Sequence, residues 1–235
     1  MQTVMFDLDD TLFDHRQTSA AALWAQAESR AALARRPRHL VEREFRRLLE
    51  ETWTRVLAGE LTPEAARAER FRRLVLWCGE EISLAQAEAL AVGYRAEYQG
   101  QRRPVPGALE LLQTLRGRVS IGIVTNNFVE EQREKLAHCG FTDLVSYLVT
   151  SEEVGAPKPG REIFDTALRR AGCSPVEAVM VGDNWASDIM GATRVGIRAV
   201  WFNPGQLTCP DPTLAMEIHS LAPATRTAEL LLRAE

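Results

Sequence analysis

The chain has 235 residues, which suffices for one large domain or for a core with a smaller insert. Its 46% hydrophobic and 26% charged residues are ordinary globular usage, which excludes disordered and fibrous classes. The net charge of −4 argues against nucleic acid as a main partner, because such binding neutralises phosphates with a basic surface. Residues 1–8 lack a signal-peptide pattern and no apolar run reaches membrane-spanning length, so we expect a cytoplasmic protein without a membrane partner.

The first predicted element is a buried strand over residues 3–6, followed directly by Asp7, Asp9 and Asp10. From about His15 to Gly100 the composition shifts to Ala, Leu, Arg and Glu, with apolar residues at helical spacing. Breaks near residues 37, 59–63 and 79 predict about four helices, one of them with Thr62 as its N-cap and Pro63 at its first position. A linker over residues 102–107 ends this helical block.

After the linker, strands alternate with helices. Strands are predicted at residues 119–125, 144–150, 178–182 and 197–202. Helices are predicted near residues 108–115, 129–138, 161–171, 187–195 and 227–233, and the Pro-rich stretch 203–223 is expected to wrap irregularly over the core. This alternation predicts an α/β fold with a doubly wound, Rossmann-like parallel sheet, made of residues 1–14 and 104–235 and interrupted by the helical insert 15–103.

Polar residues follow three of the predicted strands, and ligands of open parallel sheets bind at the carboxyl ends of the strands. Asp7 and Asp9 are two apart and would project from one side of an extended chain, with Asp183 arriving from another strand. Three crowded carboxylates repel one another unless a cation neutralises them. Because these are oxygen ligands without a nearby His or Cys, the sequence favours Mg²⁺ as the cofactor.

Lys158 lies in a stiff loop, Gly155-Ala156-Pro157-Lys158-Pro159, that would fix an ammonium over such a site. Only Lys135 and Lys158 of the 28 basic residues are lysines. A chain that otherwise uses Arg as its basic residue thus has the compact ammonium of a lysine at residue 158, which supports a role at the site. The alternative is that the positions of the two lysines are due to chance.

These residues resemble the motifs of the haloacid dehalogenase superfamily. Asp7-Leu8-Asp9-Asp10-Thr11-Leu12 resembles its D-x-D-x-T-L motif, Thr125 its second motif, Lys158 its third, and Gly182-Asp183 through Asp188 its G-D-x-x-x-x-D fourth motif. All four occur in order. The resemblance covers nearly the whole chain if the helical block 15–103 is the α-helical cap that these enzymes insert after the first motif.

The resemblance implies a magnesium-dependent phosphatase with a small phosphorylated metabolite as substrate. Asp7 would attack phosphorus and Asp9 would act as general acid and base. Thr125 and the Asn126 backbone N–H would bind phosphoryl oxygens, and Lys158 would offset the developing charge. The metal ligands would be Asp7, the Asp9 backbone carbonyl and Asp183, with Asp188 supporting either the metal or Lys158.

Several stretches of the core, among them Ile121 to Asn126 and Ser151 to Gly155, resemble bacterial pyrimidine 5′-nucleotidases and N-acylneuraminate-9-phosphatases. A sugar-phosphate phosphatase or a phosphomutase of the same fold are the alternatives. A 2-haloacid dehalogenase is disfavoured because Asp9 is present, and a non-catalytic binding protein is disfavoured because every catalytic position is filled. The sequence leaves the oligomeric state open.

Three further interpretations follow from single residues. Asp10 stands where many relatives carry Gly, which affects the local turn. Trp185 lies inside the fourth motif and serves either to line the pocket or to pack. The four widely spaced cysteines, Cys78, Cys139, Cys173 and Cys209, are expected to be buried free thiols.

Overall fold

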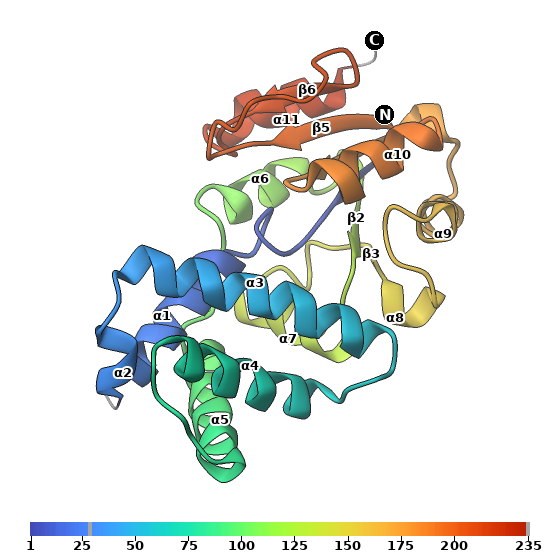
Figure 1. The fold of residues 1–235 in the computed structure, drawn as a ribbon. Helices are drawn as coiled ribbons and strands as arrows, with labels where there is room; N and C mark the ends of the chain where they lie inside the picture. Colours follow the sequence, from blue (N-terminus) through green and yellow to red (C-terminus); the bar gives the residue numbers. More distant parts are fainter. Residues whose placement is uncertain (28–29, 234–235) are drawn as a thin grey trace. The chain divides into compact units, whose positions relative to one another are not determined.

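A computed structural model describes residues 1–27 and 30–233 (Figure 1). The chain divides into two compact units, one made of residues 1–15 with 102–235 and the other of residues 16–101. The described residues contain no helix that is both long and apolar enough to cross a membrane.

The larger unit is built on a six-stranded sheet in which every neighbouring pair is parallel, in the order β3-β2-β1-β4-β5-β6. The strands are β1 (Thr3–Phe6), β2 (Ser120–Thr125), β3 (Tyr147–Thr150), β4 (Ala178–Gly182), β5 (Arg198–Phe202) and β6 (Ala215–Ile218). The predicted α/β, Rossmann-like parallel sheet is therefore confirmed. Because the short β1 is central, it brings the residue after it, Asp7, between the ends of β2 and β4.

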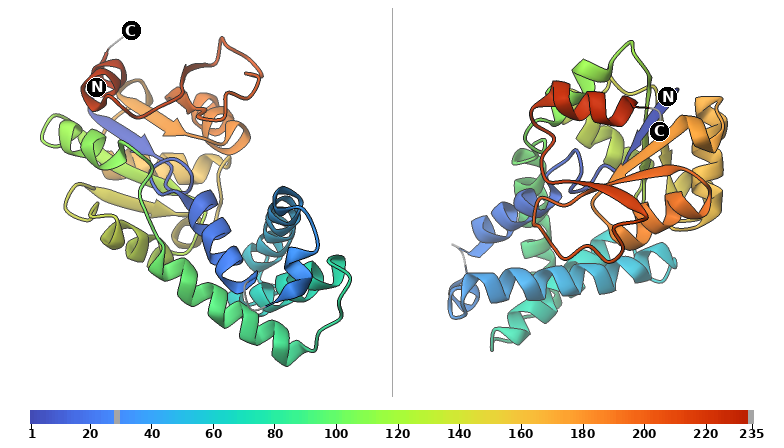
Figure 2. Two further views of the ribbon diagram at one scale, coloured as in Figure 1. Left: turned by 90° about the vertical axis from the view of Figure 1, so that its left-hand side faces the viewer. Right: turned by 90° about the horizontal axis from the view of Figure 1, so that it is seen from above.

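Helices follow the strands of this unit. They are α6 (Ala108–Leu115), α7 (Val129–His138), α8 (Ser151–Val154), α9 (Arg161–Ala171), α10 (Met190–Arg194) and α11 (Ala224–Leu232), with the 3₁₀ turn η1 (Pro175–Glu177) and the π-helical turn η2 (Trp185–Ile189). Helices α6 and α11 lie side by side, although more than a hundred residues separate them in the sequence (Figure 2).

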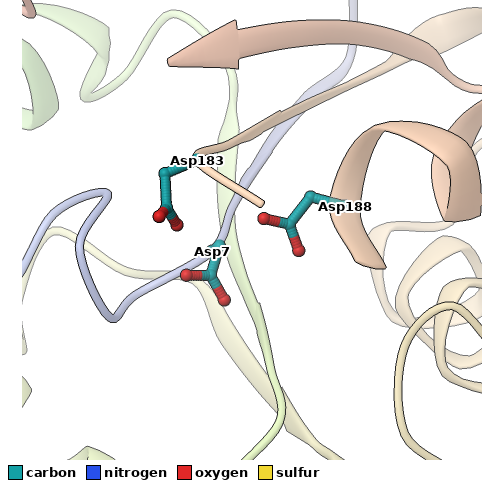
Figure 3. Close-up of side chains that lie close together, drawn as sticks. All are labelled: Asp7, Asp183 and Asp188. Carbon is teal, nitrogen blue, oxygen red and sulfur yellow. The ribbon is translucent and has the colours of Figure 1, made fainter. Parts of the chain in front are cut away.

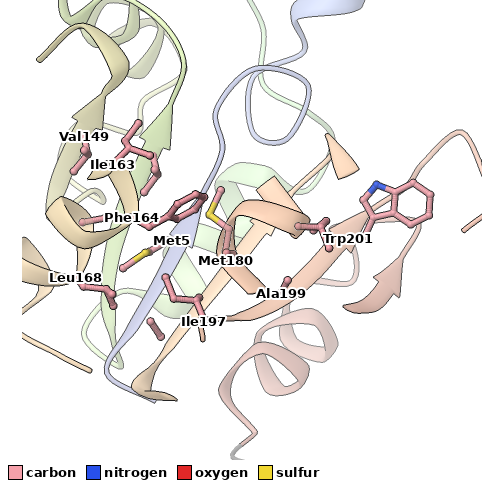
Figure 4. Packing of buried hydrophobic residues seen from close by; sticks show 14 residues of the cluster. Met5, Val149, Ile163, Phe164, Leu168, Met180, Ile197, Ala199 and Trp201 are labelled. Carbon is pink, nitrogen blue, oxygen red and sulfur yellow. The ribbon is translucent and has the colours of Figure 1, made fainter. Parts of the chain in front are cut away.

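The buried cluster on one face of the sheet joins the strands to α9, η2 and α10. Met5, Val149 and Met180 of the sheet pack with Ile163 and Phe164 of α9, all of them fully buried (Figure 4). Side chains of this size each contribute about 1.5–3 kcal/mol when fully buried. The cluster therefore holds rigid the strands whose ends carry the polar residues.

The smaller unit is helical. Its helices are α1 (His15–Ala27), α2 (Ala31–Ala34), α3 (Arg38–Leu57), α4 (Pro63–Trp77) and α5 (Leu84–Gly100). The first residue of α1, His15, still belongs to the N-terminal segment of the larger unit. The Thr62 side chain accepts a hydrogen bond from the Ala65 backbone N–H at 3.2 Å with Pro63 at N1, which confirms the predicted start of α4. The short α2 is one helix more than predicted.

Four sequence-based expectations were wrong in part. Residues 203–223 contain β6, a short edge strand whose Pro-rich flanks conceal it. The strand predicted from residue 144 begins only at Tyr147, because residues 141–145 form a turn. The helix predicted from residue 187 begins as η2 at Trp185. Cys78 and Cys139 are buried, but Cys173 and Cys209 are partly exposed.

Candidate active site

Three carboxylates meet at the carboxyl end of the central strands. Asp7 follows β1, Asp183 follows β4 and Asp188 belongs to η2, and one oxygen of each lies within 4.8 Å of the others (Figure 3). The sequence predicted such a cluster with Asp9 as its third carboxylate, and this is wrong. Asp188 takes that place, because the π-helical turn after Asp183 directs it back toward β1.

Lys158 neutralises part of this cluster. Its Nζ lies 2.5 Å from Asp7 Oδ1 and 2.8 Å from Asp188 Oδ1, and it also donates to the Val124 carbonyl at 2.7 Å. Burial by itself would lower the pKa of Lys158, but Asp188 and Asp7 together raise it above its usual value. The ammonium therefore remains charged although the residue is 4% exposed.

Burial raises the pKa of Asp7 well above its usual range, Asp188 and Asp183 add to that rise, and Lys158 opposes it. One ammonium for three close carboxylates leaves an excess of negative charge. A divalent cation would remove it, and carboxylate oxygens at this spacing are the donors that Mg²⁺ prefers. The residues present thus fit a metal ion, which the oxygens of Asp7, Asp183 and Asp188 that are not engaged by Lys158 could hold.

Asp188 is held from several sides. It is 1% exposed and accepts hydrogen bonds from the Asn184 backbone N–H and the Ser187 hydroxyl, both at 3.0 Å, besides its contact with Lys158. The sequence left two roles open for Asp188, support of the metal or support of Lys158. The direct contact with Lys158 favours the second role. Neighbouring Trp185 packs edge-on against Trp201, with ring centroids 5.1 Å apart, which favours the packing interpretation of this residue.

Thr125 is the last residue of β2 and Asn126 follows it, at the same end of the sheet. The Thr125 hydroxyl accepts a hydrogen bond from Gln132 Nε2 at 2.7 Å, so its own proton remains for another acceptor. The Asn126 side chain clasps the backbone of Lys158, accepting from its N–H at 2.7 Å and donating to its carbonyl at 2.9 Å. The sequence did not predict this pair of hydrogen bonds, which fixes the backbone of the loop that carries Lys158.

Asp9 lies in a different environment from Asp7. Its Oδ1 accepts a hydrogen bond from Lys135 Nζ at 2.6 Å, and its Oδ2 accepts from Gln132 Nε2 at 3.1 Å and Asn127 Nδ2 at 3.3 Å. Burial would raise the pKa of Asp9, but Lys135 and then His15 outweigh it and lower that pKa to about 2.

The sequence interpretation missed these partners of Asp9. Lys135 and Gln132 look like ordinary residues of a helix, and the one available indication was that Lys135 is the second of only two lysines in the chain. Asp10 adopts φ of 62°, in the left-handed region where glycine is favoured. Asp is among the few residues other than glycine that tolerate this conformation, so Asp10 can hold the turn after Asp9.

Comparisons with known proteins show the family of this chain. Residues 1–196 match the model of the haloacid dehalogenase-like hydrolase family, and the chain belongs to that family. Pyrimidine 5′-nucleotidase YjjG of Escherichia coli is 46% identical over 101 residues, which are 43% of this chain and 45% of that protein. Ribulose-1,5-bisphosphate 5-phosphatase of Halopiger xanaduensis is 36% identical over 210 residues, covering 86% of this chain and 85% of that protein.

Solved structures share the fold. The HAD-hydrolase YfnB of Bacillus subtilis, solved bound to magnesium, is 24% identical with a TM-score of 0.76, and the match covers 99% of each chain. With a family model over most of the chain and relatives named as phosphatases, this protein is a phosphatase enzyme of the haloacid dehalogenase type.

Proposed function

We propose that this phosphatase hydrolyses small phosphomonoesters through an aspartyl phosphate on Asp7, with Mg²⁺ as cofactor and a pyrimidine 5′-nucleotide as the preferred substrate. The observation that carries the mechanism is the position of Lys158, whose Nζ bridges Asp7 and Asp188 beside the carboxylate of Asp183. The ammonium beside Asp7, together with a bound cation, would reduce the repulsion between this carboxylate and the dianionic phosphate that it must attack.

In the first step, Asp7 attacks phosphorus, the bond between phosphorus and the ester oxygen breaks, and that oxygen takes a proton from Asp9. Because Lys135 and His15 lower the pKa of Asp9 to about 2 in the free protein, this step requires that the dianionic substrate raise that pKa on binding, so that Asp9 takes up a proton. Thr125 and the Asn126 backbone N–H bind the phosphoryl oxygens. In the second step, water attacks the same phosphorus and gives its proton to Asp9, and the bond between phosphorus and Asp7 breaks to release phosphate. Asp7, the Asp9 carbonyl and Asp183 would hold Mg²⁺, which would stabilise the negative charge that develops on the phosphoryl oxygens.

The nucleotide preference rests on the likeness to YjjG, which is 46% identical over 101 residues. Longer matches are to enzymes named for sugar phosphates and phosphoserine, such as phosphoserine phosphatase of Thermus thermophilus at 33% identity over 237 residues, so a sugar-phosphate phosphatase is the second candidate. We further propose that the helical unit, residues 16–101, serves as a cap that selects the substrate.

The test is phosphate release from a panel of 5′-nucleotides, sugar phosphates, phosphoserine and 2-haloacids, with and without Mg²⁺. Asp7→Asn removes the nucleophile and is expected to abolish turnover while the variant stays folded. A preference for sugar phosphates would retain the mechanism and discard the nucleotide assignment. Halide release from 2-haloacids, or undiminished turnover by Asp7→Asn, would contradict the mechanism itself.

A further inference from the structure

Helix α7 presents two polar side chains toward Asp9. Gln132 and Lys135 are three residues apart and so lie on one face of the helix. Lys135 Nζ donates to Asp9 Oδ1 at 2.6 Å, and Gln132 Nε2 donates to Asp9 Oδ2 at 3.1 Å. The two oxygens of the carboxylate are therefore held separately, which fixes both its direction and the rotation of its plane.

The burial of Lys135 and Gln132 is unfavourable for the stability of the fold. Lys135 is 1% exposed, and besides Asp9 its ammonium faces the ring of Phe13, with Nζ 5.1 Å from the centroid. Gln132 is fully buried, and its Oε1 has no hydrogen-bond donor among the described residues. A buried ammonium and an orphaned amide oxygen each cost free energy, and apolar residues would pack here at lower cost. Their presence is better explained by what they do to Asp9.

Gln132 also connects Asp9 with the phosphate site. The same Nε2 that reaches Asp9 donates to the Thr125 hydroxyl at 2.7 Å. One amide group thus sets the spacing between the proposed acid and base, Asp9, and the proposed phosphate ligand, Thr125. Such spacing matters because a displacement of about 1 Å in a reacting group costs on the order of a hundredfold in rate.

The helix that carries this pair is itself anchored. Glu131 and Glu134, on an adjacent face of α7, both accept hydrogen bonds from Arg102 Nη2 at 2.8 Å. Arg102 is the first residue of the larger unit after the helical insert. The ion pairs therefore hold α7 against the chain that leads out of that insert.

We propose that Lys135, assisted by Gln132, is a positioning residue that aims the Asp9 carboxylate at the water that hydrolyses the aspartyl phosphate. This inference rests on the proposed function, since it requires Asp9 to act in that step. In the hydrolysis of the aspartyl phosphate, the water oxygen bonds to phosphorus, the bond from phosphorus to Asp7 breaks, and one water proton passes to Asp9.

p-Nitrophenyl phosphate isolates this step. Its leaving group is a stable anion, so formation of the aspartyl phosphate does not need a proton from Asp9, and kcat/KM reports that first step alone. With Lys135→Met, kcat is expected to fall about 10- to 100-fold, less than the full contribution of a general base because Asp9 itself remains, and KM to fall with it. The phosphorylated enzyme should accumulate and be detected by acid quenching and intact mass measurement.

Two further variants complete the design. Arg133→Met changes an exposed cation of the same helix and should leave all constants unchanged. Gln132→Met should also accumulate phosphorylated enzyme, although the loss of its hydrogen bond to Thr125 should lower kcat/KM as well. Accumulation in this variant keeps the inference testable if Lys135→Met does not fold. A fall in kcat/KM equal to that in kcat, without phosphorylated enzyme, would show a merely structural role and overturn the inference, as would unchanged kinetics.

Asp9→Asn distinguishes a failure of the proposed role of Asp9 from a failure of the positioning role of Lys135. If it accumulates phosphorylated enzyme and Lys135→Met does not, only the positioning inference fails. If Asp9→Asn itself turns over p-nitrophenyl phosphate without accumulation, the proposed role of Asp9 fails and the inference with it.

Discussion

Lys158 Nζ lies 2.5 Å from Asp7 Oδ1 and 2.8 Å from Asp188 Oδ1, so a single ammonium joins a residue of the first motif to one of the fourth. Lys158 and Asp188 are 4% and 1% exposed. A buried contact of this kind is strongly weakened when one partner moves or is lost, because the other charge remains buried without compensation. The geometry around Asp188 is therefore as important to the site as Lys158 itself.

Gly182→Ala is predicted to displace Asp188. A Cβ atom on Gly182 would lie 2.3 Å from Asp188 Oδ2 and 2.5 Å from its Cβ, closer than real atoms approach. We expect kcat to fall at least about tenfold and the free energy of unfolding to fall by about 1–3 kcal/mol, the usual effect of overpacking. Kinetics with any accepted substrate and urea denaturation measure both. Gly100→Ala, where no atom lies within 4 Å, is the control, and equal behaviour of the two variants would contradict the explanation.

Binding of Mg²⁺ is predicted to stabilise the protein through Asp183. At about one hundred times its Kd, the ion adds about 2.7 kcal/mol, which raises Tm by about 5–10 °C in a protein of this size. Asp183→Asn should abolish most of that increase in a thermal shift assay, and the exposed Asp143→Asn should retain it. An undiminished Tm increase in Asp183→Asn would place the ion elsewhere.

Arg102→Met is predicted to destabilise the larger unit. Arg102 Nη2 pairs with Glu131 and Glu134 at 2.8 Å each, and its side chain is 5% exposed. The substitution removes a buried cation that contacts two neighbouring carboxylates, and we expect the free energy of unfolding in urea denaturation to fall by about 2–3 kcal/mol, since Glu134 is partly solvated. Arg103 offers a matched comparison because its pair with Asp14 is 3.5 Å long and its side chain 50% exposed. Arg103→Met should cost at most about 1 kcal/mol, and a loss as large as that of Arg102→Met would refute this account.

Alkylation of the cysteines is predicted to distinguish Cys139 from Cys209. Burial raises the pKa of Cys139 to about 11, although Arg102 and Lys135 oppose the rise. A raised thiol pKa means less of the reactive thiolate, about one part in a thousand at pH 8. Iodoacetamide should therefore modify the partly exposed Cys209 first in the native protein, as followed by peptide mass spectrometry, and urea should remove the difference. Equal rates in the native protein would be inconsistent with the burial of Cys139.

Much of the fold could be predicted from the sequence because the determining interactions are local. Thr62 and Pro63 cap α4 within one turn of chain, and apolar runs such as Ile121 to Val124 become buried parallel strands. Asp7 and Asp183 were placed together because the carboxyl ends of neighbouring parallel strands meet at one edge of the sheet.

The tertiary structure alone decided which groups neutralise which charges. Nothing in the sequence near Asp9 indicates that Lys135, 126 residues further on, reaches its Oδ1, or that Asn126 clasps the loop of Lys158. Asp188 joins the carboxylate cluster only because η2 turns back toward β1, and β6 is ordered only because β5 offers it an edge. Local sequence determines backbone conformation over a few residues, whereas the pairing of buried charges depends on distances that exist only after distant segments have packed.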